Sequence, residues 1–576
     1  MGTHDLQTYL IELNAGEKLD SKVTFFKKGW TARFKAGRKL LGRKLTLKIP
    51  KLDKKFEFPE LKALSDFDYH VDLLCDTFGS FKYEFQVEGD SESNGSGYFT
   101  VQPEWEVNGK KLSLNSLAVQ TYLTKLLGPL EDWKDRLQVA KESGYNVVHL
   151  TPVQVLGVSN SSYSIADFQA LNPSLGDVTL EDLAKFVKFL EEKWSIITIQ
   201  DVVWNHAARN APWLQEHPEC AYNCVNSPHL RPAFIIDQAL RLFSDEIGEN
   251  KWADRGIPAE LNAGHHLEAV RHALYTEVLP KIRIEEFFQV DVNSVLEAFK
   301  ERVKSNKPKE QMSDRPLEIM QDKDYKRFGS SVDIELAYSL FYKEIDGLNE
   351  EDRLNRCVED LRQALEGLNQ NKKNEAQGHI DAIVNATMGH VGYERVDGHG
   401  PRVPKVTPDK PLTTNYFVFP FEVPDLKTAE SEAYDKLNGE YIHACNGWVM
   451  NADPLKNFAE PHSQVYLRRE LVAWGDSIKL NYGYKPADCP YLWDYMLQYT
   501  ENCVKIFHGV RIDNCHSTPI HVAEYLLEKA REIRPGLYVM AELFTGSEHL
   551  DNLFVNRLGI TSLIRARRIK ETRSSH

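Results

Sequence analysis

Polar side chains follow three short apolar runs in this sequence, and their types suit nucleophilic and acid–base chemistry. The runs are SIITIQDVV at 195–203, HGVRI at 508–512 and LYVMA at 537–541. Each has the length and composition of a buried strand. Side chains gathered at the carboxyl ends of parallel strands form the active sites of (β/α)8 barrels. The candidate site residues in and after these runs are Asp201, Asn205, His206, Arg511, Asp513, His516 and Glu542.

Asp513 and Glu542 are the pair whose spacing predicts a reaction. They lie one strand–helix unit apart, so the strands before them can be neighbours. Adjacent parallel strands lie about 4.8 Å apart, which suits the roughly 5 to 5.5 Å between the two carboxyl groups of retaining glycoside chemistry. Asp513 would then attack the anomeric carbon. Glu542 would protonate the leaving oxygen and later deprotonate the acceptor.

The neighbours of both carboxylates favour these roles. Side chains alternate along a strand, so Arg511 faces the same side as Asp513, where a guanidinium favours the ionised carboxylate. Glu542 follows the apolar run YVMA, and partial burial suits a general acid. A lone Asp at a strand end is more often a helix cap or a salt-bridge partner, and Asp201 can be a structural anchor only. Three successive strand ends that carry acids rarely arise from packing alone.

Charge and composition limit the partners of this chain. The 576 residues carry a formal net charge of −14, which opposes binding to nucleic acid or to an anionic membrane. Eight cysteines at irregular spacing predict free thiols in a reducing compartment. The N-terminus has no signal-peptide pattern, and no apolar run is long enough for a membrane span. We expect a soluble cytoplasmic protein, and its oligomeric state stays open.

Two clusters have a loosely metal-like composition. Neither supplies a fourth ligand at a standard interval, and no glycine-rich phosphate loop of a standard pattern occurs. We therefore expect no metal and no cofactor. The clusters are His265, His266 and His272, on a predicted helix, and His217, Cys220 and Cys224.

The patterning changes along the chain. Short alternating runs from about 22 to 110, separated by turns such as GDSESNGSG, predict a small β-sandwich. Strands and helices then alternate, which predicts an α/β fold with a parallel sheet. We divide the chain into a β-sandwich at 1–115, the first strand–helix units at 116–206, a helical insertion at 207–440, the units that carry Asp513 and Glu542 at 441–565, and a divergent basic tail at 566–576.

Several stretches resemble a known family. DVVWNH, GVRIDNCH and MAELF resemble, in this order, three short conserved regions of the α-amylase superfamily (glycoside hydrolase family 13). Longer stretches are similar to the eukaryotic glycogen debranching enzymes, among them ESGYNVVHLTPVQ, HPECAYNCVNSPHL and GVRIDNCHSTPIHVAEY. The resemblance runs from about residue 25 to residue 565. It implies a (β/α)8 barrel of the α-amylase type with a large helical insertion, after the β-sandwich.

The resemblance also implies functions for individual residues. Asp513 matches the nucleophile and Glu542 the general acid/base of a 4-α-glucanotransferase, which moves maltooligosaccharides between α-1,4-glucan chains during glycogen breakdown. Tyr163 resembles a tyrosine that stacks on the sugar, although a core tyrosine fits the sequence equally well. His516 stays a candidate sugar contact. The remaining matches, which contact the nucleophile or the sugar, are Asp201, Asn205, His206 and Arg511.

The sequence departs from the family pattern in two ways. The superfamily has a third carboxylate, an Asp at the end of the seventh strand, whereas Asp551 is the only Asp that follows Glu542 here. The chain also ends after about the fifth barrel strand, before the family's amylo-α-1,6-glucosidase half. We therefore expect an incomplete barrel from a truncated isoform or an incomplete gene model. The alternative to an active transferase is an inactive form that only binds glycogen or partners.

Overall fold

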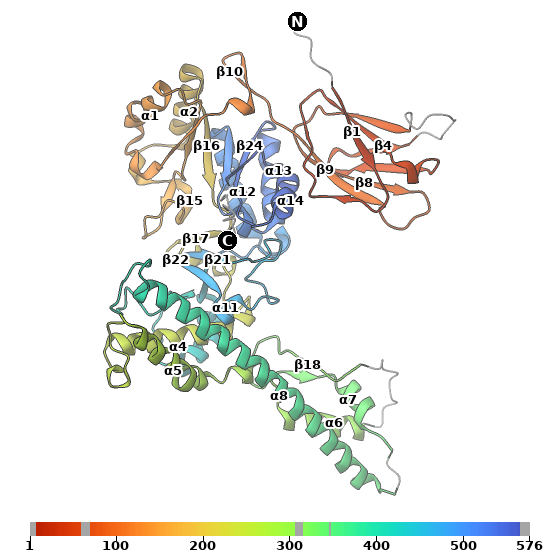
Figure 1. Ribbon diagram of the computed structural model, residues 1–576, viewed down its shortest axis with the longest axis vertical. Coiled ribbons are helices and arrows are strands. Elements are labelled where there is room, and N and C mark those ends of the chain that lie inside the picture. The colour runs from red at the N-terminus through yellow and green to blue at the C-terminus, as the bar shows by residue number, and fades with distance from the viewer. Residues whose placement is uncertain (1–6, 59–68, 306–314, 345–346, 565–576) are drawn as a thin grey trace, which may run out of the picture. The chain divides into compact units, whose positions relative to one another are not determined.

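The computed structural model describes residues 7–58, 69–305, 315–344 and 347–564 (Figure 1). Its contacts divide the chain into two compact units. The first consists of Met1–Cys220, Asn451–Asn457 and Leu480–His576, and the second of Ala221–Met450 and Phe458–Lys479. The predicted basic tail at 566–576 lies outside the described residues.

The first unit begins with two sheets that share one core, as the alternating sequence pattern predicts. One sheet has the order β1-β4-β7, and the other β2-β9-β8-β5-β6 with β3 on β9. Phe34 from the first sheet meets Tyr83 from the second, with ring centroids 5.1 Å apart. The strands are β1 (Thr8–Leu13), β2 (Lys18–Leu19), β3 (Phe25–Phe26), β4 (Thr31–Ala36), β5 (Leu45–Ile49), β6 (Lys54–Glu57), β7 (His70–Leu74), β8 (Gly79–Val87) and β9 (Gly95–Val101). The hairpin of β10 (Trp105–Val107) and β11 (Lys110–Leu112) follows.

A parallel sheet of six strands forms the rest of this unit, in the order β12-β13-β16-β23-β24-β25. The chain visits these strands in sequence order, as in a (β/α)8 barrel. All residues of β16 are buried, as expected for a parallel strand covered on both faces. The strands are β12 (Val119–Tyr122), β13 (Val147–Leu150), β16 (Ile197–Val202), β23 (Gly509–Ile512), β24 (Tyr538–Glu542) and β25 (Ser562–Ile564).

Helices connect these strands and cover the sheet (Figure 1). A capping box opens one of them, because Thr179 accepts from the backbone N–H of Asp182 and the Asp182 carboxylate accepts in return. The helices are α1 (Trp133–Glu142), α2 (Leu180–Trp194), α3 (Trp213–Glu216), α12 (Pro490–Ile506), α13 (Ile520–Ile533) and α14 (Glu548–Leu558). Three short strands, β14 (Gln154–Leu156), β15 (Ile165–Leu171) and β17 (His206–Ala208), lie in the connections.

The second unit is mainly helical and interrupts the connection between β16 and β23. Its longest helix buries Cys357, Leu361 and Leu365 on one face, at the helical spacing that the sequence shows. The helices are α4 (Arg231–Gly248), α5 (Gly264–Ala273), α6 (Val292–Lys304), α7 (Ile334–Phe341), α8 (Glu350–Val391), α9 (Leu426–Tyr434), α10 (Lys436–Glu440) and α11 (Val465–Arg468). The strands are β18 (Ile319–Met320), β19 (Ser331–Val332), β20 (Phe417–Val418), β21 (His443–Val449) and β22 (Leu471–Lys479).

The second unit extends beyond the predicted insertion, which we placed at 207–440. Strands β21 and β22 pair antiparallel and belong to it. Ala444 and Leu471 from these strands share a core with Phe234 of α4. The hairpin therefore packs with the helical insertion, and the first unit resumes at Leu480.

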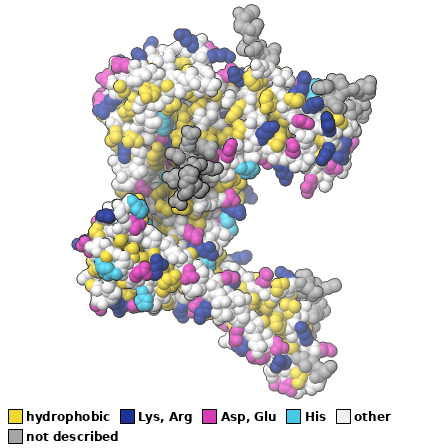
Figure 2. All heavy atoms as spheres, in the orientation of Figure 1, with side chains coloured by type: hydrophobic (Ala, Val, Ile, Leu, Met, Phe, Trp, Pro, Cys, Tyr) yellow, Lys and Arg dark blue, Asp and Glu magenta, His cyan; other side chains and the backbone are white. Residues whose placement is uncertain are grey.

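On the face shown in Figure 2, basic and acidic side chains are interspersed. Within the described ranges, no helix is long and apolar enough to cross a bilayer.

Candidate active site

Strand register places the predicted catalytic residues side by side in the first unit. Asp201 in β16 pairs with Arg511 in β23, and Ile512 in β23 pairs with Ala541 in β24. Asp513 and Glu542 follow these two partners directly at the carboxyl ends of neighbouring strands. The expected juxtaposition of the two carboxylates is therefore present in the fold.

Arg511 connects three carboxylates. Its Nη1 lies 2.7 Å from Asp201 Oδ1 and 3.2 Å from Asp513 Oδ1. Its Nη2 lies 3.2 Å from Glu542 Oε2. The guanidinium is almost fully buried, so these pairs are weakly screened by solvent. One cation thus fixes the relative positions of the candidate nucleophile and the candidate acid/base.

Asn514 provides a second connection between the same two carboxylates, which the sequence did not suggest. Its backbone N–H donates to Glu542 Oε2 at 3.1 Å, and its side-chain amide donates to Asp513 Oδ2 at 2.9 Å. The residue has φ of 46°, a left-handed conformation that Asn tolerates better than most residues. The turn after β23 therefore directs both donors toward the site.

The surroundings of Asp513 act on the pKa of its carboxyl in both directions. Burial raises the pKa of Asp513 well above its ordinary value, and the carboxylates of Asp201 and Glu542 add to this shift. Arg511 and Asn514 act in the opposite direction, as predicted for Arg511, but do not offset it. Arg511 thus favours the ionised carboxyl, as the sequence predicts, while burial and the two acidic neighbours set the net direction of the pKa shift.

Asn205, His206 and Tyr163 form a second group next to this cluster. The Nδ1 of His206 lies 2.7 Å from the Asn205 side-chain oxygen, and its Nε2 lies 3.0 Å from the backbone oxygen of Tyr163. The Tyr163 ring lies 5.6 Å from the guanidinium carbon of Arg511. Burial raises the pKa of Tyr163, so its hydroxyl remains protonated and can donate. The tyrosine lies in the site and not in a distant core.

His516 lies in the short helical turn Cys515–Ser517 that follows Asp513. The imidazole is half-buried, and its ring centroid lies 5.8 Å from that of Phe544, which is 40% exposed. Ser517 in the same turn accepts a hydrogen bond from the Asn205 amide at 3.2 Å. All the predicted site residues are thus in the first unit.

Two further residues clarify the site. His149 in β13 lies 3.1 Å from Asp201 and was not predicted, although a histidine in the apolar run NVVHLT was a visible signal. Asp551 lies in α14, where it accepts a hydrogen bond from Thr545 at 2.6 Å. As the sequence predicts, it does not lie at the end of a strand.

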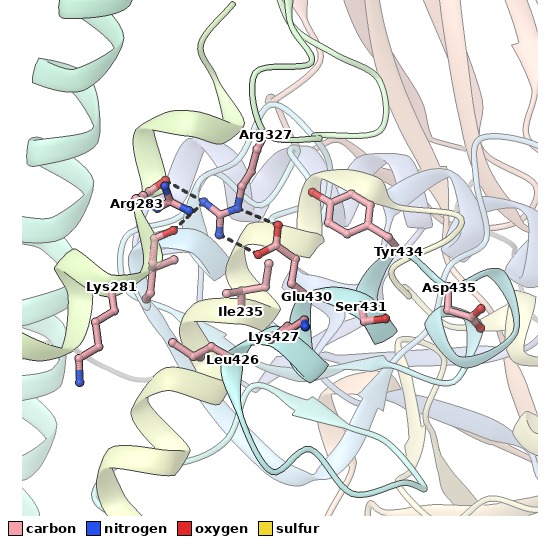
Figure 3. A pocket seen from close by; sticks show the side chains of 11 residues that line it. Ile235, Lys281, Arg283, Arg327, Leu426, Lys427, Glu430, Ser431, Tyr434 and Asp435 are labelled. Carbon is pink, nitrogen blue, oxygen red and sulfur yellow. Dashed lines mark hydrogen bonds and ion pairs between the residues drawn. The ribbon is translucent and has the colours of Figure 1, made fainter. Parts of the chain in front are cut away.

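A separate pocket of about 530 Å³ lies in the second unit (Figure 3). Its central feature is the ion pair between Arg327 and Glu430, at 2.7 and 2.9 Å. Asp435, also in the lining, accepts from the backbone N–H groups of Leu437 and Asn438 as the cap of α10. Both acids are therefore engaged by structural partners. The pocket lacks the facing pair of carboxylates that the first unit has.

The histidines and cysteines of the two clusters with a loosely metal-like composition lie in both units. His265 and His266 lie in α5 with ring centroids 4.2 Å apart, and Cys220 Sγ lies 3.7 Å from Cys489 Sγ. In the described parts of the chain, no group of three or more His, Cys, Asp or Glu side chains is arranged to hold a metal ion.

Comparison with known proteins gives a family match that spans parts of both units. Residues 110–538 match the model of the glucanotransferase domain of glycogen debranching enzyme. The glycogen debranching enzyme of Saccharomyces cerevisiae is 35% identical over 515 residues, which is 86% of this chain and 32% of the relative. This chain thus spans about a third of the length of that relative.

Solved structures of α-amylases are more distant. An α-amylase from Geobacillus thermoleovorans, complexed with acarbose, is 12% identical with a TM-score of 0.30, over 79% of this chain and 52% of that chain. An α-amylase from Lactobacillus plantarum is 10% identical with a TM-score of 0.28, over 75% of this chain and 46% of that chain. Because the family match covers most of this chain, the protein belongs to the family of the glycogen debranching enzyme glucanotransferase domain.

Proposed function

We propose that this chain is a 4-α-glucanotransferase that moves maltooligosaccharide segments between α-1,4-glucan chains. The observation that carries the proposal is the pair of Asp513 and Glu542 at adjacent strand ends, both in contact with Arg511. Two carboxylates held in this way are the machinery of retaining glycosyl transfer. The family match supports a glucan as the substrate, with glycogen and maltooligosaccharides as donors and acceptors.

The reaction proceeds in two displacements. In the first, an Asp513 oxygen attacks the anomeric carbon of the donor, while Glu542 gives its proton to the leaving glycosidic oxygen. This step forms a glycosyl ester on Asp513 and releases the shortened glucan. In the second, Glu542 takes the proton of an acceptor hydroxyl, whose oxygen attacks the anomeric carbon and releases Asp513. Two inversions retain the α configuration.

The contacts of Glu542 suit its two roles. In the described structure, the contacts from Arg511 and from the Asn514 N–H both fall on Oε2. This leaves Oε1 to exchange the proton with the sugar oxygen. The Glu542 side chain is 20% exposed, compared with 4% for Asp513, so the acid/base remains more accessible than the nucleophile.

We further propose that the protein acts in the cytoplasm. All eight cysteines are buried and unpaired, as expected for a chain that folds and works in a reducing compartment. Fractionation of cells that produce the chain tests this proposal, and recovery with a secreted fraction contradicts it.

A transfer assay tests the function directly. The purified chain is incubated with maltotetraose, and the products are separated by length. We expect both shorter and longer maltooligosaccharides, because each transfer shortens a donor and extends an acceptor. Glucan chains that are only shortened would indicate a hydrolase, and glycogen retention without any product would indicate a binding protein.

The dependence of transfer on pH follows from the raised pKa of Asp513. The nucleophile must be ionised, so kcat/KM should rise with pH through the pKa of this carboxyl in the free enzyme. We expect the acid limb above the ordinary aspartate value of 3.8. Asp201→Asn removes one of the charges that raise the pKa and should move the limb to lower pH. A limb at or below 3.8 in the unsubstituted chain contradicts this account.

The pocket of the second unit provides a negative prediction. Glu430→Gln removes the carboxylate that holds Arg327 and should lower the free energy of unfolding by about 1 to 3 kcal/mol. The rate of transfer by the folded chain should not change, because neither Arg327 nor Glu430 belongs to the proposed active site. Urea unfolding and the transfer assay measure the two effects. A tenfold loss of transfer in a folded Glu430→Gln chain would place chemistry in this pocket.

A further inference from the structure

His149 occupies a buried position next to the proposed active site. It is 5% exposed and lies in β13, between β12 and β16 in the parallel sheet. Its Nε2 lies 3.1 Å from Asp201 Oδ2, and its Nδ1 lies 3.1 Å from the Thr121 hydroxyl. Thr121 and His149 are direct partners in the register of β12 and β13. The imidazole therefore contacts one polar group on each side.

These contacts extend a row of polar side chains across the sheet. Thr121 contacts His149, His149 contacts Asp201, and Asp201 contacts Arg511. Arg511 then contacts both Asp513 and Glu542. The row crosses five neighbouring strands in the order β12, β13, β16, β23 and β24. Each member lies at or near the carboxyl end of its strand, where the chemistry is proposed.

Asp201 is the connection that makes His149 relevant to the reaction. Its side chain is fully buried, with one oxygen at Arg511 and the other at His149. A buried carboxylate is costly to leave unpaired, and His149 Nε2 lies within ion-pair distance of Asp201 Oδ2. If the imidazole is removed, Asp201 can turn away from Arg511, and Arg511 then loses one of the three charges that fix its position.

We propose that His149 is a positioning residue for the glycosyl transfer. It orients Asp201, which holds Arg511, and Arg511 sets the positions of the nucleophile and the acid/base. The expected loss of turnover rests on the proposed transferase function. The expected movement of Asp201 and Arg511 does not. His149 itself touches neither the sugar nor the reacting atoms.

Two substitutions separate positioning from simple burial. His149→Leu keeps the volume but removes both polar contacts. His149→Gln keeps an amide donor near the place of Nε2. We expect His149→Leu to lower kcat by up to about 100-fold with KM changed less than threefold, because small displacements of catalytic groups have effects of this size. We expect His149→Gln to recover most of the rate.

His508 provides a matched control. It is also buried and contacts an acid, with Nε2 3.1 Å from Glu191, but it lies directly before β23, at the end of the strand away from Asp513. His508→Leu should leave kcat within threefold of the unsubstituted chain. An equal loss in the His149 and His508 variants, or a loss in His149→Leu that Gln does not recover, overturns the inference.

A crystal structure of the His149→Leu chain gives a readout without turnover. We expect an intact sheet in which Asp201 has rotated and Arg511 Nη1 is no longer within hydrogen-bonding distance of both Asp201 and Asp513. An unchanged Arg511 overturns the positioning role, whether or not the chain transfers glucans. If the unsubstituted chain has no transfer activity, this result contradicts the proposed function but not the positioning role, because the crystal structure still tests that role.

Discussion

Asp513→Asn should abolish glucan transfer, with a loss in kcat on the order of 10⁴-fold or more. The amide that replaces the carboxylate has almost the same shape but cannot form the glycosyl ester. One of the two contacts, from the Asn514 amide or from Arg511, must also rearrange, because the new amide has only one oxygen that accepts. The measurement is the initial rate of product formation from maltotetraose.

The control for this variant is the same Asp-to-Asn substitution at an exposed position. Asp494→Asn alters an exposed carboxylate in α12 and should leave the rate within twofold of the unsubstituted chain. Thermal unfolding shows whether Asp513→Asn remains folded. Because the pKa of Asp513 is raised by burial and by two acidic neighbours, a neutral group at this position should not destabilise the fold. Transfer at a tenth or more of the original rate would exclude Asp513 as the nucleophile.

Arg511→Leu should have the largest effect on stability. The substitution leaves the carboxylates of Asp201, Asp513 and Glu542 without their shared cation in a buried site. Removing one partner of a buried ion pair costs about 3 to 5 kcal/mol in the free energy of unfolding. Transfer should be lost as well, since the nucleophile and the acid/base are no longer fixed. Urea unfolding at several pH values measures the stability.

The stability that the Arg511→Leu chain loses should depend on pH in one direction. The folded-state pKa of Asp513 already lies above its unfolded value of about 3.8, so the folded chain binds more protons between these two values. Stability therefore falls as pH rises through this window, and loss of Arg511 extends the window upward. The Arg511→Leu deficit should be smaller at pH 5 than at pH 8. A deficit that grows as pH falls contradicts the proposed clustering of charge.

Arg557→Leu is the matched control for this substitution. Arg557 binds Glu524 at 2.7 and 2.8 Å, but this pair is partly exposed and lies on α14 and α13. Its loss should cost about 1 kcal/mol or less, with little dependence on pH between 5 and 8. Equal destabilisation by the two substitutions would mean that Arg511 is no more important to the fold than a partly exposed arginine.

The sequence was sufficient to predict that Asp513 and Glu542 lie at the ends of neighbouring strands, because strand geometry is regular. A buried strand of known length places its last side chain at the edge of the sheet, and alternation places Arg511 on the same side as Asp513. The spacing of Asp513 and Glu542 then makes them neighbours. These inferences need only local patterns, and the register of β23 and β24 agrees with them.

Other features depend on contacts that local patterns do not contain. The contacts of Asn514 depend on its left-handed backbone conformation. The contact of His149 with Asp201 depends on which strands are adjacent. The direction of the Asp513 pKa shift depends on burial and on how many acids face one guanidinium. The sequence also did not show that β21 and β22, which lie beyond residue 440, pack with Phe234 in the helical unit.

The central claim is that Asp513 carries the transferred glycosyl group. The most direct test uses Glu542→Gln with α-maltotriosyl fluoride, a donor whose leaving group needs no protonation. The first displacement can then proceed, whereas the second is slow because no base activates the acceptor. Mass spectrometry of the quenched and digested chain should find the maltotriosyl mass on the peptide that contains Asp513. An adduct on another residue, or fluoride release without any adduct, would contradict the account.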